Sequence, residues 1–453
     1  QAYAAGLVVN DNDLRNDLAW LSDRGVIHLS LSTWPLSQEE ISRALKKAKP
    51  SYSSEQVVLA RINQRLSALK ADFRGTGYTS TDQPGTPQGF GQTQPADNSL
   101  GLAFNNSGEC WDVHLQGNVE GGERISNGSR FNANGAYGAV KFWNQWLSFG
   151  QVPQWWGPGY EGSLIRGDAM RTMTGFLMQR AEQAAPDTWW LRWVGPWQYP
   201  LSASQMNQYI AVPHAKIIGG RFTFLPFQSL ELGASRIMQW GGEGRPESFS
   251  SFWDGFTGHD NTGTDNEPGN QLAGFDFKFK LEPTLGLPIS FYAQMIGEDE
   301  AGFLPSANMY LGGIEGHHGW GKDAVNWYLE KQMRTEKTVL ISISIYSSNL
   351  PVFWKSVQTA FSFAGLDFLN GYECQADAAS AGFLADLLCN QLAGETAYYI
   401  FIDDFHLLTD GRVADFLCLL ANRMTSNVHL IAASRDRFLS GGAVVRLWRK
   451  LHQ

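Results

Sequence analysis

The stretch Phe275-Asp-Phe-Lys-Phe-Lys-Leu281 decides how most of this chain folds. Large apolar side chains occupy every second position, and Asp276, Lys278 and Lys280 stand between them. Because successive side chains of a β-strand point to opposite faces of a sheet, this period predicts a strand with one apolar and one charged face. The same alternation recurs at Leu100 to Phe104, Trp111 to Gln116, Phe222 to Phe224 and Leu230 to Leu232.

The alternation alone does not identify the solvent outside the sheet, because soluble sandwiches and membrane barrels both alternate. Aromatic placement favours a membrane barrel, since tryptophan rings at strand ends suit the boundary between lipid and water. The tryptophans in question are Trp143, Trp146, Trp189, Trp190, Trp193 and Trp197. An aromatic-rich, carbohydrate-binding sandwich is the alternative. Between residues 74 and 329 there is room for about 13 strands with their loops.

Composition narrows the classes of function. The chain has 453 residues and a formal net charge of −9, so we expect no surface that binds nucleic acid through its phosphates. It contains no uncharged apolar run of about 18 residues, the length that a membrane-spanning helix requires. Cys110 is the one cysteine before residue 331, and Cys374, Cys389 and Cys418 follow it. This contrast predicts an exported first part and a second part from a reducing cytosol.

Residues 11–73 are predicted to form three short helices. Ser37 and Glu40 have the spacing of a capping box at the start of the second helix. The third helix begins at Ser53, with Gln56 three residues further on. It carries an apolar stripe at helical spacing, formed by Val58, Ile62, Leu66, Leu69 and Phe73. We expect this stripe to be a packing face and assign it no chemistry.

The segment Gln151-Val-Pro-Gln-Trp-Trp-Gly-Pro-Gly-Tyr-Glu-Gly-Ser-Leu-Ile165 resembles the Wzi capsule-assembly family of Gram-negative outer membranes. The likeness runs from Ala5 to Glu330 and includes Trp240 to Glu247 and Gly312 to Trp320. The resemblance implies an antiparallel outer-membrane barrel with a small helical bundle on its periplasmic side. It also implies a lectin-like, non-enzymatic role in holding group 1 capsular polysaccharide at the cell surface.

Polysaccharide binding needs flat apolar rings for the C–H faces of sugars and planar polar groups for hydroxyls and acidic groups. The segment after residue 151 offers both. The residues that we predict to bind polysaccharide are Trp155, Trp156, Tyr160, Arg166 and Arg171, with Trp253 in a second glycine-rich loop near His259 and Asp260. The alternative interpretation is a rigid plug without a ligand, stiffened by Gly157-Pro-Gly159.

No catalytic residue, metal site or cofactor is predicted. His317 and His318 are adjacent, but no carboxylate or cysteine joins them at a familiar ligand spacing. A glycosidase pair is defined by the distance between two carboxyl groups, which a sequence does not give. We therefore expect a binding protein and no enzyme.

After Glu330 the likeness to the capsule-assembly family stops. Thr338 to Ile345 is a continuous β-branched run, typical of a strand in a buried parallel sheet. Further strands at Tyr398 to Ile402 and from Val428, with helical sequence between them, predict an α/β fold. This part resembles the nucleotide-binding domain of the LuxR-type, MalT-like transcription regulators. Through that resemblance, Asp403 and Asp404 match a Mg²⁺-coordinating strand end and Arg435 matches a sensor arginine.

A phosphate-binding loop has the pattern G-x-x-x-x-G-K-[ST]. Gly316, Gly321 and Lys322 fit this pattern, but Asp323 replaces the hydroxyl residue. The nucleotide-binding set that the second resemblance implies is Lys322, Asp403, Asp404 and Arg435. The segment from Gly321 to Leu329 resembles both families. This short local similarity suggests that two unrelated sequences were spliced there and that the chain is chimeric.

The sequence thus predicts a mainly β fold: an incomplete antiparallel outer-membrane β-barrel, preceded by a helical bundle and followed by an α/β fragment. The predicted divisions are a signal-peptide remnant at 1–4, the bundle at 5–73, the barrel portion at 74–330 and an ATPase-like fragment at 331–453. The predicted location is the bacterial outer membrane, with capsular polysaccharide and outer-membrane lipid as partners. The alternative function is that of a nucleotide-binding α/β module of a LuxR-type regulator.

Overall fold

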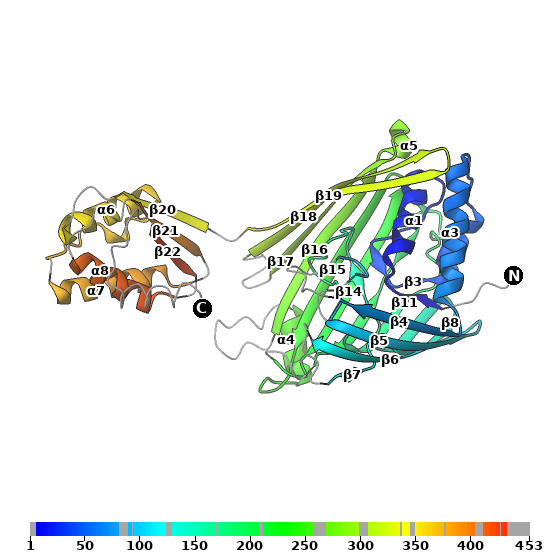
Figure 1. Ribbon diagram of the computed structural model, residues 1–453, viewed down its shortest axis with the longest axis horizontal. Coiled ribbons are helices and arrows are strands. Elements are labelled where there is room, and N and C mark those ends of the chain that lie inside the picture. The colour runs from blue at the N-terminus through cyan, green and yellow to red at the C-terminus, as the bar shows by residue number, and fades with distance from the viewer. Residues whose placement is uncertain are drawn as a thin grey trace. The chain divides into compact units, whose positions relative to one another are not determined.

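The computed structural model divides the chain into two compact units, Gln1–Arg334 and Thr335–Gln453. Figure 1 shows the helices and strands of both units, and each unit has its own apolar core. The structure describes residues 6–80, 89–92, 94–123, 129–168, 171–207, 212–257, 269–298, 307–335, 338–344, 349–375, 377–394, 396–403, 411–425 and 427–432.

The first unit begins with the three predicted helices, α1 (Asn12–Asp23), α2 (Gln38–Lys46) and α3 (Ser53–Leu69). The hydroxyl of Ser37 accepts the backbone N–H of Glu40 at 3.2 Å, as the capping pattern predicts. At α3 the capping carboxylate comes from Glu55 and not from the predicted Gln56, because Glu55 accepts the N–H of Tyr52 at 3.1 Å. No helix in the described part of the chain has the length and apolar character needed to cross a membrane.

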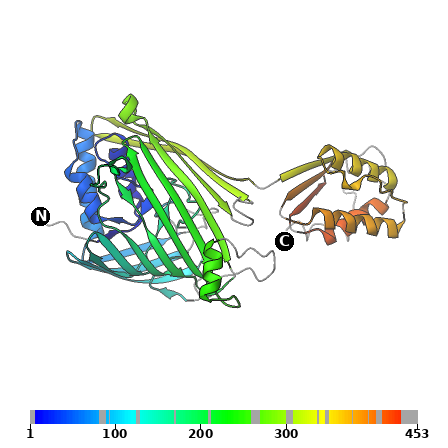
Figure 2. The ribbon, with the colours of Figure 1, turned by 180° about the vertical axis from the view of Figure 1, so that it is seen from behind.

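Fifteen strands of the first unit form one antiparallel sheet (Figures 1 and 2). They begin with β4 (Phe73–Thr79), β5 (Ala96–Ser107), β6 (Trp111–Glu123), β7 (Phe131–Asn132), β8 (Tyr137–Phe142), β9 (Gln145–Gly150), β11 (Thr174–Arg180) and β12 (Trp197–Gln198). They continue with β13 (Leu201–Gln205), β14 (Lys216–Phe227), β15 (Leu230–Trp240), β16 (Gly269–Lys280), β17 (Ile289–Glu298), β18 (Ala307–Trp320) and β19 (Asp323–Thr335). Phe73 therefore begins β4 and does not extend the stripe of α3, which corrects the sequence prediction.

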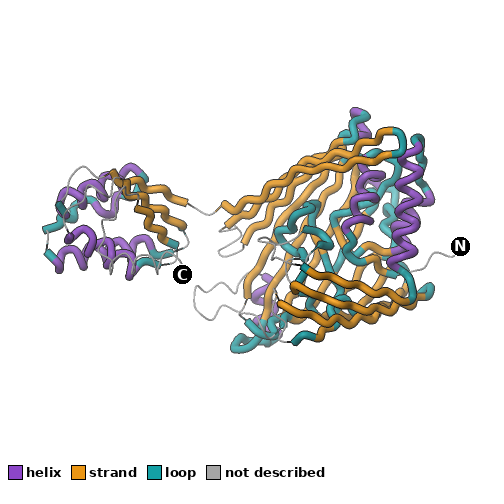
Figure 3. The backbone as a smooth tube through the Cα atoms, viewed as in Figure 1, coloured by secondary structure: helices purple, strands orange, loops and turns teal. Residues whose placement is uncertain are grey.

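The order of pairing is β19-β18-β17-β16-β15-β14-β13-β11-β9-β8-β6-β5-β4, with β12 beside β14 and β7 beside β6. At one end of the sheet most neighbouring strands are joined by short turns, although residues 181–200 connect β11 to β13 there. At the other end the strands are joined mainly by long segments. The helices lie at the short-turn end (Figure 3). There the Ser53 hydroxyl donates to the carbonyl of Gly321 at 2.8 Å. The long segments include residues 151–173 and 241–268, the latter carrying α4 (Phe249–Thr257).

The two faces of this sheet identify it as a barrel wall. On β16, Phe275 is 68% exposed and Phe277 is 41% exposed, whereas Asp276 between them is 5% exposed. Lys278 and Lys280 are also buried on the inner face. A wall that is apolar outside and charged inside suits surrounding hydrocarbon, whereas a soluble sandwich buries its apolar faces. The barrel interpretation is confirmed.

The predicted tryptophan belt is confirmed in part. Trp143 is 92% exposed in the β8–β9 turn, and Trp189 is 81% exposed in the segment that follows β11. Trp146 was wrongly placed in this belt, because it is fully buried on the inner face of β9. Its indole N–H donates to Glu39 of α2 at 3.2 Å, so it joins the bundle to the wall.

Asp23, at the end of α1, connects the helices to the charged face of the sheet. Its carboxylate lies 3.0 Å from Lys278 Nζ and 3.0 Å from His317 Nε2, and it accepts the hydroxyl of Ser290 at 3.0 Å. Burial alone would raise the pKa of Asp23, but the nearby Lys278 and His317 charges hold it well below its usual range. The helical bundle is therefore held inside the barrel by buried ion pairs.

The sheet is open between its two end strands. In the described part of the chain, β4 and β19 each pair on one side and do not pair with each other. Each edge strand presents backbone N–H and C=O groups, and an unpaired group costs several kcal/mol in hydrocarbon. We therefore expect these two edges to need a cover before lipid can surround the wall.

The second unit is an α/β layer structure. Its three strands, β20 (Thr338–Ser344), β21 (Ala397–Asp403) and β22 (Val428–Ala432), form a parallel sheet in that order. The helices α6 (Leu350–Phe363) and α7 (Ala378–Leu392) lie between β20 and β21 in the chain, and α8 (Gly411–Arg423) lies between β21 and β22. Its core includes Ile341, Phe353, Leu384, Ile400 and Phe416. The predicted α/β arrangement is confirmed.

We expect Asp23→Asn to lower the free energy of unfolding by about 3–5 kcal/mol, because it leaves the Lys278 charge buried with less compensation. The pKa of Asp23 is lowered in the folded state. Its ionised carboxylate therefore stabilises the fold fully at pH values above 3.8, its usual pKa, and this stabilisation is lost as the pH falls through the lower folded-state pKa. Denaturant unfolding in detergent, followed by tryptophan fluorescence at neutral and acidic pH, measures both effects.

The matched control is Asp13→Asn, because the side chain of Asp13 is 77% exposed and lies 3.9 Å from Arg65. An exposed pair contributes about 1 kcal/mol or less. Equal stability of the two variants at neutral pH would contradict the anchoring role of Asp23.

Candidate functional site

Residues 151–168 fold into the barrel and meet the N-terminal segment there. Trp155 and Trp156 form β10, which pairs antiparallel with β2 (Thr33–Trp34). Gly157 has a φ of 143°, and a Cβ at this position would lie 2.8 Å from the Gln294 side chain. The carbonyl of Trp156 accepts the Gln294 amide at 3.0 Å. Glycine is therefore required where the segment passes the barrel wall.

The aromatic residues of this segment are largely packed. Trp156 is fully buried, and Tyr160 is 7% exposed. The ring of Tyr160 stacks on Tyr328 with a centroid distance of 4.8 Å, and the Arg15 guanidinium lies 4.4 Å from it. The structure thus places Trp156 and Tyr160 in the plug that the alternative interpretation described. That they bind polysaccharide stays a prediction.

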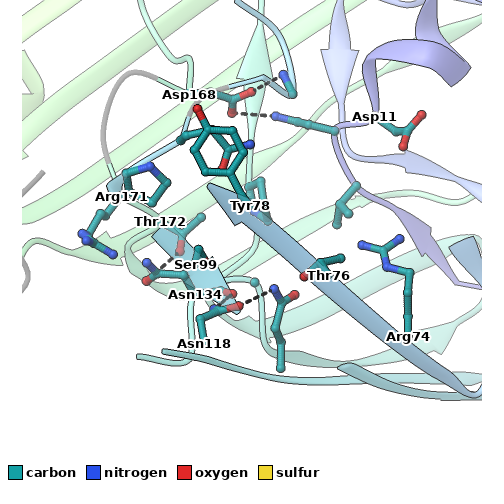
Figure 4. A pocket seen from close by; sticks show the side chains of 18 of the residues that line it. Asp11, Arg74, Thr76, Tyr78, Ser99, Asn118, Asn134, Asp168, Arg171 and Thr172 are labelled. Carbon is teal, nitrogen blue, oxygen red and sulfur yellow. Dashed lines mark hydrogen bonds between the residues drawn. The ribbon is translucent and has the colours of Figure 1, made fainter. Parts of the chain in front are cut away.

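A cavity of about 540 Å³, which we name the amide cavity, lies between this segment and strands β4 to β6. Figure 4 shows its polar side chains. Those labelled there are Asp11, Arg74, Thr76, Tyr78, Ser99, Asn118, Asn134, Asp168, Arg171 and Thr172. Arg74, Thr76 and Tyr78 stand on alternate positions of β4, so the strand period directs all three inward.

A row of hydrogen-bonded side chains on β6 forms one wall of the amide cavity. Gln116 donates its amide to Asn118 at 2.9 Å, and Asn118 donates to the carbonyl of Asn134 at 3.1 Å. The His114 Nε2 lies 2.9 Å from the Gln116 carbonyl oxygen. These bonds fix the amide groups in place, which prepares donors and acceptors for the hydroxyl groups of a ligand.

Among the described residues, the acidic groups of the amide cavity have partners, and the guanidinium of Arg74 has an unsatisfied nitrogen. Arg171 pairs with Glu120 at 2.7 Å, and both side chains are buried. Asp168 accepts the Asn10 amide and the backbone N–H of Gly91, each at 2.7 Å. Burial raises the pKa of Asp168 despite these bonds. The Nε of Arg74 is buried and has no hydrogen-bond partner within the described protein.

A second cavity of about 730 Å³, which we name the arginine cavity, lies on the other side of the same segment. Its walls include Trp155, Arg166 and Arg171, so the structure brings three of the predicted binding residues together. Apolar side chains from the barrel wall, such as Ile217 and Ile237, complete it. Both volumes are within the range of about 300–1,000 Å³ that is common for ligand sites.

The remaining predicted residues lie elsewhere. Trp253 is 52% exposed on α4 and lines neither cavity. Lys322 is exposed in the β18–β19 hairpin turn, whereas a phosphate loop joins a strand to a helix. Asp403 ends β21 in the second unit. Asp404, Arg435, His259 and Asp260 lie outside the described residues.

The adjacent histidines face opposite sides of β18. His317 is buried beside Asp23 and Glu315, the one group in the described part of the chain with three closely spaced potential metal ligands. The ammonium of Lys278 lies between these carboxylates and forms ion pairs with both. A positive charge already occupies the place that a cation would take, so the group acts as an ion-pair network. His318 instead stacks on Trp327.

Sequence reasoning missed the amide cavity. The polar series His114, Gln116, Asn118 and Glu120 alternates with apolar residues and was visible as the polar face of a strand. In a barrel this face is the interior, so the series could have indicated a polar lumen. The contribution of Arg74 and Tyr78 was hidden because Phe73 was assigned to the helical stripe and the glycine-rich sequence after it indicated a loop, so β4 was not predicted as a strand.

Comparison with known proteins gives concordant results. The family model described as capsule assembly protein Wzi matches residues 74–338. An uncharacterised 55.8 kDa protein in the cps region of Klebsiella pneumoniae is 94% identical over 330 residues, which cover 73% of this chain. The chain spans 66% of the length of that protein.

A solved structure is also similar, with a TM-score of 0.68 and 90% identity over 72% of this chain and 71% of the other. It is that of Wzi from Escherichia coli, described as an outer membrane protein involved in group 1 capsule assembly and as a carbohydrate-binding β-barrel.

The Arg171–Glu120 pair predicts that Arg171 is needed for stability whether or not it binds a ligand. We expect Arg171→Met and Glu120→Gln each to lower the free energy of unfolding by about 3–5 kcal/mol, because each leaves a buried partner without its counterpart. The double variant should lose less than the sum of the two, since the residues act as a pair. Denaturant unfolding in detergent measures the cycle, and simple additivity would contradict it.

Proposed function

This chain belongs to the Wzi family of capsule assembly proteins, and from that premise we propose that it is a lectin-like outer-membrane protein that binds capsular polysaccharide and attaches it at the cell surface. The amide cavity is the observation that carries this proposal. Its fixed Gln116 and Asn118 amides, the guanidinium of Arg74 and the ring of Tyr78 face one space of about 540 Å³. Amides and guanidinium groups suit sugar hydroxyls, and an aromatic ring suits their C–H faces.

The sheet has its apolar face outside and its charged face inside, the reverse of a soluble protein. This arrangement supports the outer-membrane location. Exposed aliphatic and aromatic side chains such as Leu102 and Phe275 cover the outside, where lipid would contact them. The polar interior then provides the water-filled space that a polysaccharide segment requires. Most of the long connecting segments join strands at the end opposite the helical bundle, and we infer that this end faces the cell exterior.

The carboxylates beside the cavities favour binding over hydrolysis. A glycosidase places two carboxyl groups on either side of the scissile bond. Glu120 is held by Arg171, and Asp168 is held by Asn10 and Gly91. Both groups therefore have structural partners, and we propose no catalytic role for either.

The likeness of residues 331–453 to a regulator's nucleotide-binding domain stays a prediction. The parallel order of β20, β21 and β22 is common to many α/β folds and does not distinguish this likeness from others. The hairpin position of Lys322 in the other unit speaks against the phosphate loop that the alternative function would need. We therefore propose polysaccharide binding as the function and give nucleotide binding no role in it.

We expect Tyr78→Ala and Arg74→Ala each to weaken binding of capsular polysaccharide by about 3- to 10-fold, from the loss of one stacking or hydrogen-bonding contact. Neither side chain makes a hydrogen bond within the described protein that its removal would break. Isothermal titration of the full chain in detergent with oligosaccharides cut from a group 1 capsule measures the change, with Mg-ATP as the parallel ligand.

The control is Tyr52→Ala, which removes a tyrosine ring that is 63% exposed outside both cavities. It should leave the affinity unchanged. Equal affinities for all three variants and the parent chain would exclude the amide cavity as the site, and heat released by Mg-ATP alone would favour the nucleotide-binding alternative.

A further inference from the structure

Arg166 is a buried cation that faces the arginine cavity. Arg166 is 9% exposed. Its backbone carbonyl accepts the N–H of Trp156 at 2.9 Å, which fixes the position of the residue in the segment. Its guanidinium makes no hydrogen bond or ion pair within the described protein, and its Nη1 atom is fully buried without a partner. The Trp156 ring lies 5.6 Å from the guanidinium carbon and makes a cation–π contact with it.

The carboxylates around the arginine cavity are already engaged. Asp168 lines it but accepts bonds from Asn10 and Gly91, and Glu161 accepts the hydroxyl of Tyr328. Arg171 has its own carboxylate in Glu120. Burial lowers the pKa of Arg166 to about 10, and no charge among the described residues opposes the shift.

A buried charge without a counter-charge is costly, and such groups in proteins are normally paired. The indole Nε1 of Trp155 and the side-chain carbonyl oxygen of Gln154 belong to residues of the same cavity, and neither atom has a hydrogen-bond partner among the described residues. In addition to the guanidinium of Arg166, the indole N–H of Trp155 is therefore available as a donor to a ligand, and the side-chain carbonyl of Gln154 is available as an acceptor. These unsatisfied groups point to an occupant that carries a negative charge and a hydroxyl group.

We propose that the arginine cavity is a subsite for the oxyanion of an acidic sugar, held by the guanidinium of Arg166 with the indole N–H of Trp155 as a second donor. The inference rests on the proposed function and adds the chemical class of the bound unit. A carboxylate or a phosphate group would supply the shared chemistry. The amide cavity would hold the neutral, hydroxyl-rich part of the same chain.

The test uses an acidic capsular oligosaccharide and its carboxyl-reduced form, in which each uronic acid has become a neutral sugar. We expect the full chain in detergent to bind the acidic form about 10- to 100-fold more tightly, the size of a charge-assisted contact. Arg166→Gln should abolish this preference, and Arg166→Lys should retain part of it. Arg245→Gln, which removes the same charge outside both cavities, should leave the preference intact.

The melting temperature of the unliganded variant shows whether a loss of binding comes from misfolding. Because Arg166→Gln removes an uncompensated buried charge, the unliganded variant should melt no lower than the parent chain. Competition by glucuronic acid or by glucose 6-phosphate then assigns the oxyanion as a carboxylate or a phosphate, and competition by neither would overturn the subsite.

The outcomes separate the two proposals. Equal binding of the acidic and reduced forms, unchanged in Arg166→Gln, would overturn the subsite and leave polysaccharide binding in place. Failure of the parent chain to bind either form would overturn the proposed function, and the subsite with it.

Discussion

The sheet of the first unit has its apolar face outside and its charged face inside, and the rest of the unit depends on this constraint. Apolar side chains such as Phe275 and Leu115 point outward, and Asp276, Lys278 and Gln116 point inward. Because charged groups inside a wall need partners, the N-terminal helices enter the barrel and supply them. Asp23 pairs with Lys278 and His317 for this reason. The interior is consequently a mixture of ion pairs and polar cavities instead of an apolar core.

The segment 151–173 divides this interior into the two cavities. Its β10 strand pairs with β2, so the segment is fixed to the N-terminal region and not only to the wall. Its buried aromatic rings give rigidity, while Arg166 and Arg171 extend from it toward the cavities. Rigid placement reduces the entropy lost when a ligand binds, which favours a lectin built inside a barrel over one built from mobile loops.

The sequence predicted the elements better than the site. The period of two, the helix caps and the β-branched run of β20 are local signals, so strands, helices and the α/β fragment were all expected. The role of Trp155 to Tyr160 depended on what lies against them, which local pattern does not reveal. Trp146 was misplaced because a tryptophan near a strand end has either face available. The row of amide side chains on β6 was overlooked because a polar strand face is ordinarily the solvent-exposed surface. It indicates a binding cavity only when that face is known to line the barrel interior.

One measurement tests the central claim that the inner face binds polysaccharide while the outer face contacts lipid. Spin labels would be placed at the neighbouring β6 positions Leu115 and Gln116, in a chain whose four cysteines have been replaced. The account predicts that oxygen dissolved in the lipid reaches the label at 115, that an aqueous nickel complex reaches the label at 116, and that capsular polysaccharide shields only the label at 116. Equal access of the nickel complex to both labels, or no shielding at 116, would contradict it.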